Sequence, residues 1–443
     1  MKFPPILREG LRRTSFILPT SRHPDPGLQA FWNCAEISLL LFPLWPAVGA
    51  VGLALVALGT WKQQMKAIVR RPLNWGLAIL SGWLLITACF AFQPPDAMLG
   101  LANLLPYFII FAGYSTLIQT PEQLRQMAWI LVMPSVLVVI IGFGQLFWGW
   151  SSSVNFLGWA IEPQGNPSGR MASVFMYANI LAAYLQVVFI LALGLWIENF
   201  QSLRDRPLKD SASLRLGFLS VIVMGSAIAL ILTNSRNAWT ITILSCLAFA
   251  IYQGWRWLLA VVAAVAGSVL WAAFGPSPVR EWLRAIVPAY FWARLTDQLY
   301  ADRPPEMLRV TQWQFAWSMT QQRPWTGWGL RNFTALYKEQ MHVWLGHPHN
   351  LFLMLTAETG IPATIVFCGL VGWVLAQGVL LIANCSKDRL ILFSYLLAFG
   401  GCTLFNTVDV TLFDLRVNTL GWLLLSAICG VVYKKKAIAP NPN

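Results

Sequence analysis

The sequence has little charge for its length. Asp, Glu, Lys and Arg together make up 11% of the 443 residues, whereas hydrophobic residues make up 57%. A soluble protein of this length would carry more charge and clearer polar faces. Several apolar runs are long enough to cross a hydrocarbon core of about 30 Å, which takes about 20 helical residues. The composition therefore excludes an ordinary soluble fold and predicts an all-α polytopic membrane protein.

The sequence also lacks the usual marks of a metal or redox site. Its seven cysteines show no CxxC and no Cys/His ligand spacing, and most lie within apolar runs, as small residues of a helix core do. His347 and His349 flank one proline, which is a poor chelating geometry without carboxylate partners nearby. We therefore expect no metal and no cofactor. Repeats of fixed period and low-complexity tracts are absent too, so we expect one integral domain.

Apolar segments alternate with polar links through most of the chain. They predict about 12 transmembrane helices, with a large helical loop on the outer side between spans 9 and 10. The first two segments are short and closely joined, so a hairpin that only partly enters the membrane is an alternative for them. The expected spans are residues 30–45, 46–61, 74–92, 98–118, 127–149, 173–196, 216–233, 238–254, 257–274, 361–384, 389–407 and 415–433.

The basic residues set the expected orientation. One set of links collects most of the Lys and Arg side chains, as cytoplasmic loops do. Residues 1–29 and 434–443 are therefore expected to be cytoplasmic tails, and residues 30–433 the integral membrane domain. That domain includes the outer loop at 275–358, with amphipathic helices. The net charge of +13 then reports topology, because nucleic-acid binding would need a basic face on a soluble domain.

Three arginines on the outer side are candidates for anion binding. Arg170 and Arg236 each lie within about a turn of an apolar span, where an arginine is costly unless it snorkels or has a partner. Arg309 lies on an expected half-apolar helix of the outer loop. Arg170 and Arg236 can snorkel to the interface, and the helix of Arg309 can be an interfacial helix with Trp anchors. Alternatively, each arginine can offer a planar fork to phosphate oxygens. Both alternatives stay open for Arg236 and Arg309, whereas the sequence favours snorkelling for Arg170.

The run Gly346-His347-Pro348-His349-Asn350 holds the candidates for acid–base chemistry. Histidine takes and gives a proton readily near neutral pH. Asn350 begins an amphipathic run at 351–357, and Glu358 follows it. The alternative is an interfacial histidine that only hydrogen-bonds its neighbours, but three arginines on the same side favour a functional site. Such a site suits an anionic lipid donor, for example a lipid diphosphate linked to a sugar.

With these features the chain resembles the O-antigen ligase / O-antigen polymerase superfamily of bacterial inner-membrane proteins. Five stretches carry the resemblance, in order and on one predicted face, from about residue 165 to 365. They are residues 170–179, similar to the family's Arg…Phe…Asn-Pro-Asn segment with Ala178 in place of Pro; 232–239, similar to Leu-Thr-x-Ser-Arg-x-Ala-Trp; 309–317, similar to its Arg…Trp helix; 323–333, similar to Arg-Pro-x-x-Gly-x-Gly-x-x-x-Phe; and 349–360, similar to His-Asn…Glu-x-Gly.

The resemblance implies transfer of a glycan from undecaprenyl diphosphate on the periplasmic face. In ligases the acceptor is a lipid A–core sugar hydroxyl, and the family mechanism is metal-independent and inverts the transferred sugar. Carried over to this chain, Arg236 and Arg309 would bind the diphosphate and His349 would act as the base. The remaining matches are Arg170, as a further diphosphate ligand, and His347, Asn350 and Glu358, as supporting groups.

Other functions remain open at this point. The superfamily includes polymerases, which extend the glycan, and cyanobacterial members named as bicarbonate transporters. This chain resembles the latter at residues 231–239 and 323–333, but its His349-Asn350 pair favours an enzyme. An anion transporter would also need polar groups near the middle of the membrane, where this sequence has few. A non-catalytic scaffold would instead use the Trp-rich outer segment to bind a partner.

Overall fold

The computed structural model describes residues 22–152, 159–204, 210–296, 304–384 and 388–438. Regular strands are absent from these residues, which confirms an all-α protein. Most of the expected tails, residues 1–21 and 439–443, lie outside the described part. Residues 22–28 already pack on the helices, because the His23 side chain is buried and its Nε2 lies 2.8 Å from the Leu117 carbonyl oxygen.

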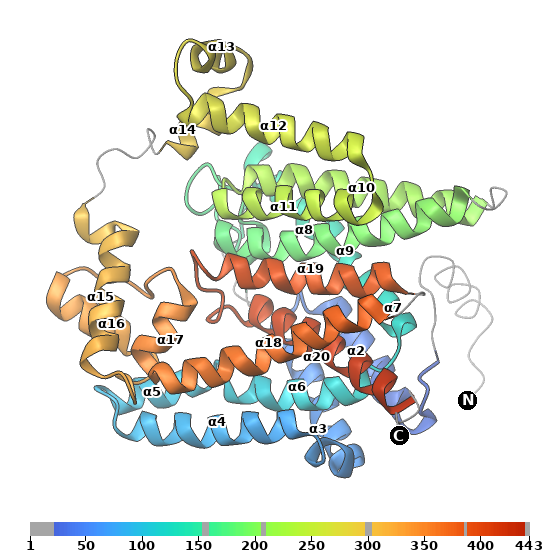
Figure 1. The fold of residues 1–443 in the computed structure, drawn as a ribbon, viewed down its shortest axis with the longest axis vertical. Helices are drawn as coiled ribbons and strands as arrows, with labels where there is room; N and C mark the ends of the chain where they lie inside the picture. The colour runs from blue at the N-terminus through green and yellow to red at the C-terminus, as the bar shows by residue number, and fades with distance from the viewer. Residues whose placement is uncertain (1–21, 153–158, 205–209, 297–303, 385–387, 439–443) are drawn as a thin grey trace.

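The long helices run side by side, and a group of shorter ones lies at one end of them (Figure 1). In chain order the α-helices are α2 (Gln29–Leu41), α3 (Pro46–Val69), α4 (Pro72–Cys89), α5 (Pro94–Leu101), α6 (Leu105–Leu117), α7 (Pro121–Val132), α8 (Ser135–Phe147), α9 (Ala178–Arg204), α10 (Asp210–Leu232), α11 (Arg236–Gln253), α12 (Arg256–Phe274), α13 (Val279–Ile286), α14 (Ala289–Leu295), α15 (Arg309–Gln322), α16 (Asn332–Met341), α17 (Leu351–Thr359), α18 (Ile361–Asn384), α19 (Arg389–Phe405) and α20 (Leu415–Ile438).

The structure confirms a multi-pass membrane protein. Among the described residues, eight segments are long and apolar enough to cross a membrane. The other predicted spans are helices as well, namely α2, α3, α11 and α19, but each is shorter or less apolar, so the number twelve stays a prediction. The eight segments are Pro72–Cys89, Pro94–Leu117, Pro121–Phe147, Ala178–Leu203, Ala212–Leu232, Arg256–Phe274, Ile361–Asn384 and Leu415–Ala437.

Several predicted spans are interrupted or begin elsewhere. The predicted span 127–149 is divided into α7 and α8 at Pro134, because proline has no N–H and disfavours a helical residue before it. The predicted span 173–196 begins later than expected, at Ala178. Ser173–Phe175 form a 3-10 turn and Met176 has φ +63°, so the backbone cannot enter the α-helix before that point.

Two helices form the centre of the protein. The apolar windows of α9 and α20 are 83% and 89% buried, whereas those of α12 and α18 are only 11% buried. α9 packs on α7, α10, α11 and α19, and α20 packs on α6, α18 and α19. The exposed faces of α12 and α18 are therefore left for the surrounding lipid.

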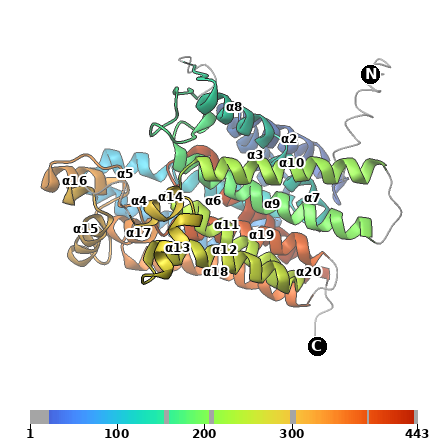
Figure 2. The ribbon, with the colours of Figure 1, turned by 90° about the horizontal axis from the view of Figure 1, so that it is seen from above.

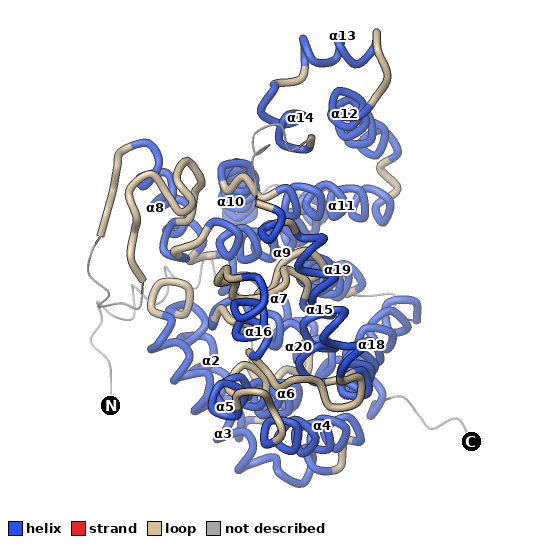
Figure 3. Tube along the Cα trace, turned by 90° about the vertical axis from the view of Figure 1, so that its left-hand side faces the viewer, coloured by secondary structure: helices blue, strands red, loops and turns tan. Residues whose placement is uncertain are grey.

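The helices α15, α16 and α17 cover one end of this arrangement, here called the capped end. The described chain ends near residues 22 and 438 lie at the opposite end (Figure 1), and a second view shows the same separation (Figure 2). The predicted helix at Arg309 is confirmed as α15. Its buried side is mixed rather than apolar, since Gln312 and Thr320 are buried beside Phe315 and Met319. Seen from the capped end, loops lie around α15 and α16 (Figure 3).

Candidate functional site

Two histidines and one aspartate meet at the capped end. His349 Nδ1 lies 3.2 Å from Asp409 Oδ1, and His347 Nε2 lies 3.9 Å from the same oxygen. The two imidazole rings are edge to face, with centroids 4.5 Å apart. The Asp409 side chain is 8% exposed, whereas those of His347 and His349 are 20% and 24% exposed. The carboxylate is thus enclosed while the imidazoles remain accessible to a ligand.

Asp409 comes from the short link between α19 and α20. The Asn406 side chain closes this link, because its Oδ1 accepts hydrogen bonds from the backbone N–H and the hydroxyl of Thr411, at 2.9 and 3.2 Å. The Asn406 carbonyl also accepts a hydrogen bond from the Leu351 N–H at 2.9 Å. The link that carries Asp409 is therefore fixed to the first residue of α17.

His349 is held by the backbone just before α17. Its φ is +51°, a left-handed conformation that few residues other than glycine adopt. Its N–H donates to His347 Nδ1 at 3.2 Å. Asn350 is the N-cap of α17, with its Oδ1 accepting from the Leu353 N–H at 3.0 Å. The amphipathic run expected after Asn350 is the helix α17, and Asn350 fixes the end of this helix beside the histidine.

A chain of hydrogen bonds leads from Asp409 to Arg170. Asp409 Oδ2 accepts from Asn179 Nδ2 at 2.7 Å, and Asn179 Oδ1 accepts from an Arg170 guanidinium nitrogen at 2.5 Å. Arg170 Nε also donates to the Thr233 carbonyl at 2.8 Å. The snorkelling interpretation, which the sequence favoured for Arg170, is therefore wrong. The arginine is held by polar groups of the protein and orients the amide that in turn holds Asp409.

The other two candidate arginines lie around this group on separate helices. Arg236 is the first residue of α11, and its neighbour Asn237 donates from Nδ2 to the Phe405 carbonyl at 2.9 Å, at the end of α19 where the Asp409 link starts. Arg309 is the first residue of α15, and its charge contributes to lowering the pKa of His347. Arg309 thus lies close enough to influence His347, and Arg236 begins a helix whose next residue is tied to the start of the Asp409 link.

The protonation states follow from burial and charge. Burial lowers the pKa of His347 to about 4, and the charge of His349 lowers it further. The charge of Asp409 raises this pKa but does not outweigh the other two effects, so His347 is neutral at pH 7. Burial alone would raise the pKa of Asp409, but the hydrogen bond from His349 and the charges of both histidines outweigh it and lower that pKa. An ionised carboxylate only accepts hydrogen bonds, so His349 Nδ1 must donate to it. The lone pair of His349 is then on Nε2, where it can take a proton.

Residues 219–368 match a family described as O-Antigen ligase. This segment belongs to the O-antigen ligase family. The match confirms the resemblance to the O-antigen ligase / O-antigen polymerase superfamily. Among curated proteins, none matches the chain. The O-antigen ligase segment contains both histidines, Arg236 and Arg309, whereas Arg170, Asn179 and Asp409 lie outside it.

Glu358 lies at the far end of α17 within the O-antigen ligase segment. Between Asn350 and Glu358 the helix advances about 12 Å, so the structure separates Glu358 from the histidines. The buried Glu358 Oε1 accepts from the Phe333 N–H at 3.1 Å, and burial raises its pKa to about 7. Gly327 has φ +66° and lies so close that a Cβ there would be 2.4 Å from the Glu358 carbonyl carbon. The Glu358 side chain therefore holds the start of α16 on α17, and its backbone carbonyl accepts from the Gly329 N–H of the turn 324–329 at 2.8 Å.

A divalent ion would find three ligands in this candidate site. The ligand atoms of His347, His349 and Asp409 lie within 4.8 Å of one another. The sequence argument against a metal assumed that no carboxylate was near the histidines, and Asp409 shows that this assumption was wrong. The hydrogen bonds favour another use of the group. His347 Nδ1 accepts from a backbone N–H, so its neutral ring carries the proton on Nε2, and both ring nitrogens that face Asp409 are donors.

Sequence reasoning missed Asp409 and did not assign Asn179 to the site. Asp409 is one of two acids in the short link 406–414, which the predicted topology already placed on the same side as His349. Few acids lie on that side near a span, which was the available signal. Asn179 was expected about two turns inside a span, whereas it lies in the first turn of α9, at the depth of the arginines.

Proposed function

We propose that this protein is a metal-independent, inverting glycosyltransferase of the bacterial inner membrane. It transfers a glycan from an undecaprenyl-diphosphate-linked donor to an acceptor hydroxyl on the periplasmic face. The proposed acceptor is a sugar of lipid A–core. Membership of residues 219–368 in the O-antigen ligase family supports a membrane protein that handles glycans. The hydrogen-bonded pair of His349 and Asp409 among three arginines is the observation that carries the mechanism.

In the proposed reaction, the acceptor hydroxyl gives its proton to His349 Nε2 as its oxygen attacks the anomeric carbon of the donor sugar. The bond from that carbon to the diphosphate oxygen breaks, and its electron pair leaves with the diphosphate. Attack from the face opposite the leaving group inverts the anomeric centre. No metal is needed for this balance, because a diphosphate leaves as an anion without being protonated.

The charges that develop have partners in the described residues. Asp409 lies 3.2 Å from His349 Nδ1 and stabilises the imidazolium that forms. Arg236 and Arg309 are proposed to hold the diphosphate, because guanidinium groups bind phosphate oxygens through two parallel hydrogen bonds. Arg170 is engaged with Asn179 and Thr233. We therefore propose that Arg170 contributes its charge and orients the Asp409 side, while direct phosphate contact falls to the other two.

The proposed orientation places the capped end in the periplasm and both termini in the cytoplasm. The positive-inside pattern of the sequence supports it. The described ends near residues 22 and 438 both lie at the end of the protein opposite α15–α17 (Figures 1 and 2). The segment 275–358 is then the periplasmic loop, and the acceptor approaches the histidines from the periplasm.

The test is the surface-glycan profile of a deletion strain complemented with wild type, His349→Ala or His342→Asn. His342 is an exposed histidine of the same segment with φ +57°, a conformation that asparagine tolerates. We expect wild type and His342→Asn to restore glycan-capped lipid A–core. His349→Ala should insert into the membrane, as an immunoblot of membrane fractions checks, but leave the core bare and the lipid-linked glycan in excess.

Other outcomes identify other functions. Single-unit caps without long chains would make the protein a polymerase, which performs the same chemistry with a different acceptor. Full capping by His349→Ala would overturn the proposed mechanism. An unchanged glycan profile together with altered uptake of a labelled inorganic anion would replace the proposal with a transporter.

A further inference from the structure

The helix α13 turns its charged face inward and its apolar face outward. Arg280 and Arg284 are four residues apart, so they share one face, and both are half-buried. Val279, Trp282 and Ile286 follow the spacing of another face and are 48%, 77% and 70% exposed. In water the apolar face of a helix would be the buried one. The medium around α13 must therefore be apolar on this face.

The position of α13 places this apolar face beside the bilayer. α13 begins at Val279, shortly after the apolar segment α12 ends at Phe274, whose side chain is itself 65% exposed. Both α13 and α14 lie toward the capped end (Figures 1 and 2), and Figure 3 looks along α12 while it shows α13 from the side. Because α12 is long and apolar enough to cross a membrane, α13 then lies along the membrane surface, as interfacial amphipathic helices do.

The charged face holds hydrogen-bond donors that the described residues do not use. Arg284 Nε donates to the Ala272 carbonyl at 2.8 Å, and its guanidinium carbon lies 4.1 Å from the centroid of the Trp292 ring. Arg280 Nε and Trp292 Nε1 are buried, and neither has an acceptor in the described part of the chain. No carboxylate among those residues forms an ion pair with either arginine. Burying a donor without an acceptor is unfavourable, so this corner of the protein suits a ligand that accepts.

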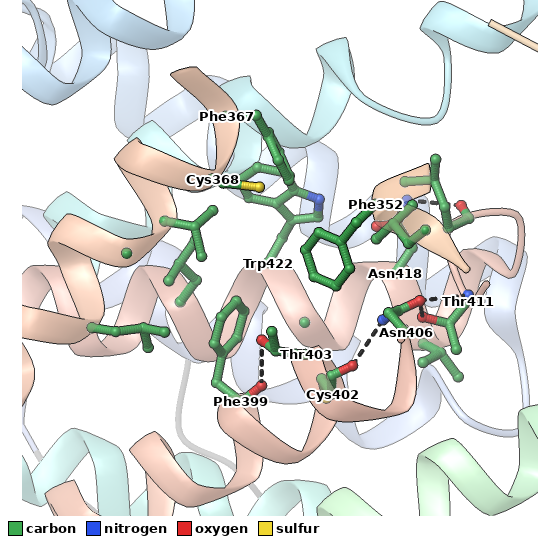
Figure 4. Close-up of a pocket in the computed structure, with 18 residues that line it drawn as sticks. Phe352, Phe367, Cys368, Phe399, Cys402, Thr403, Asn406, Thr411, Asn418 and Trp422 are labelled. Atoms are coloured by element: carbon green, nitrogen blue, oxygen red, sulfur yellow. Dashed lines mark hydrogen bonds between the residues drawn. The ribbon is translucent and has the colours of Figure 1, made fainter. Parts of the chain in front are cut away.

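A cavity beside Trp422 shows the contrast (Figure 4). There Asn406 Nδ2 donates to the Cys402 carbonyl at 2.8 Å, and the Thr403 hydroxyl donates to the Phe399 carbonyl at 3.1 Å. These polar groups are satisfied within the protein and require no polar ligand. The two arginines and the indole of the α13–α14 corner instead present only donors, and two of the three groups are cationic. Their common ligand is a compact anion with several acceptor oxygens, which is the chemistry of a phosphate.

We propose that Arg280, Arg284 and Trp292 bind the phosphate of an anionic phospholipid in the leaflet at the capped end. The guanidinium groups and the indole N–H donate to the phosphate oxygens, and the acyl chains cover Trp282 and Ile286. A free phosphate ion would satisfy the same donors but leave the apolar face uncovered, so the observations favour a lipid. None of these residues takes part in the proposed glycan transfer.

Such a lipid would also hold α14 in place. Trp292 belongs to α14, and the ring centroids of Tyr290 and Phe291 on the same helix lie 5.6 and 5.5 Å from that of Trp239. Trp239 is in the first turn of α11, whose first residue is Arg236. The bound phosphate therefore fixes a helix that packs close to a candidate site residue.

The test uses the full-length protein in detergent and a phosphatidylglycerol probe with a diazirine near its glycerol. We expect irradiation to label peptides within 279–292, and unlabelled phosphatidylglycerol to compete at least tenfold better than phosphatidylcholine. Arg280→Gln removes one of the two cations, and Trp292→Phe keeps a ring beside Arg284 but removes the N–H. Each should lower this labelling at least tenfold, while labelling of the exposed helix α18 stays as in wild type. Lys338→Gln, which removes an exposed charge from α16, is the matched control and should label as wild type does.

The outcomes distinguish the possible sources of the anion. Unchanged labelling of α13 in both variants would overturn the proposal. Equal competition by phosphatidylcholine or by inorganic phosphate would overturn an anionic phospholipid as the ligand, and stronger competition by undecaprenyl diphosphate would assign the site to that lipid instead. Without added lipid, Arg280→Gln should melt at the wild-type temperature, because the arginine makes no hydrogen bond with the described residues through its side chain. If it melts lower, Trp292→Phe and the competition series still decide.

Discussion

Replacing Asp409 with asparagine tests the proposed base most directly. The carboxylate accepts on both oxygens, from His349 at 3.2 Å and from Asn179 at 2.7 Å. An asparagine of the same shape has only one acceptor oxygen, so its NH₂ must face one of these two donors. If the NH₂ faces His349, the imidazole changes tautomer and Nε2 carries a proton when the acceptor arrives. If it faces Asn179, the link to Arg170 is lost, and in both cases the imidazolium loses its counter-charge.

The size of the effect follows from the geometry. Two unit charges 3.2 Å apart interact by about 5 kcal/mol at an effective dielectric constant of about 20. Solvent reaches His349, whose side chain is 24% exposed, so we take about 3 kcal/mol as the stabilisation of the imidazolium in the transition state. At about 1.4 kcal/mol for each factor of ten, Asp409→Asn should lower kcat about 100-fold.

The assay is glycan transfer from lipid-linked donor in membrane vesicles, with kcat and KM measured separately. We expect a lower kcat and a KM for donor close to that of wild type, because Asp409 acts on the base and not on the diphosphate. Asp414→Asn is the matched control in the same link. Asp414 Oδ1 accepts from the N–H groups of Arg416 and Val417, a capping role that asparagine fills equally well. A kcat for Asp409→Asn within threefold of wild type would refute the role of the carboxylate.

Three further predictions concern the surroundings of the pair. Asn179→Leu removes the link to Arg170 but keeps the contact of Asp409 with His349, so kcat in the same assay should fall about tenfold. A fall in kcat as large as that of Asp409→Asn would contradict the prediction that Asn179 matters less than Asp409. Zinc should inhibit the wild type by occupying the two histidines and Asp409, and a chelator should reverse this without lowering the basal rate; activity that needs added zinc would overturn metal independence. Burial raises the pKa of Glu358 from 4.5 to about 7, so the folded state binds the proton more tightly than the unfolded state. Stability in detergent should therefore fall by about 3 kcal/mol as the pH rises from 4.5 past 7, and Glu358→Gln should abolish this slope in thermal melts at several pH values.

The helical class and the segment at the capped end could be predicted because both depend on patterns within single stretches of the sequence. Long apolar runs must be helical in a membrane, and the amphipathic run after Asn350 follows from its residue pattern alone. The helix interruptions were harder to foresee. Pro134 is a local signal for the break between α7 and α8, whereas the residue types around Met176 give no such signal for its left-handed conformation before α9.

The candidate site was only half predictable, because its remaining contacts join distant parts of the chain. His349 and Asp409 are 60 residues apart, and Asn179 and Asp409 are 230 apart. Residue type and the predicted side of the membrane identified each arginine and each histidine as a candidate by itself. They did not predict which of these residues contact one another. Which acid would orient which base depends on how α9, α17 and α19 pack, and no periodicity within a single helix contains that information.

The hydrogen-bonded chain from Arg170 to His349 also bears on how such a protein can be recombined. Arg170 and Asn179 precede the O-antigen ligase segment 219–368, and Asp409 follows it. A chimera that exchanged only that segment with a relative would import the proposed base without the groups that set its tautomer. The smallest exchangeable unit is therefore a stretch from about residue 170 to 414. Exchange of that whole stretch keeps the histidine, the carboxylate and the amide from one parent in their native contacts.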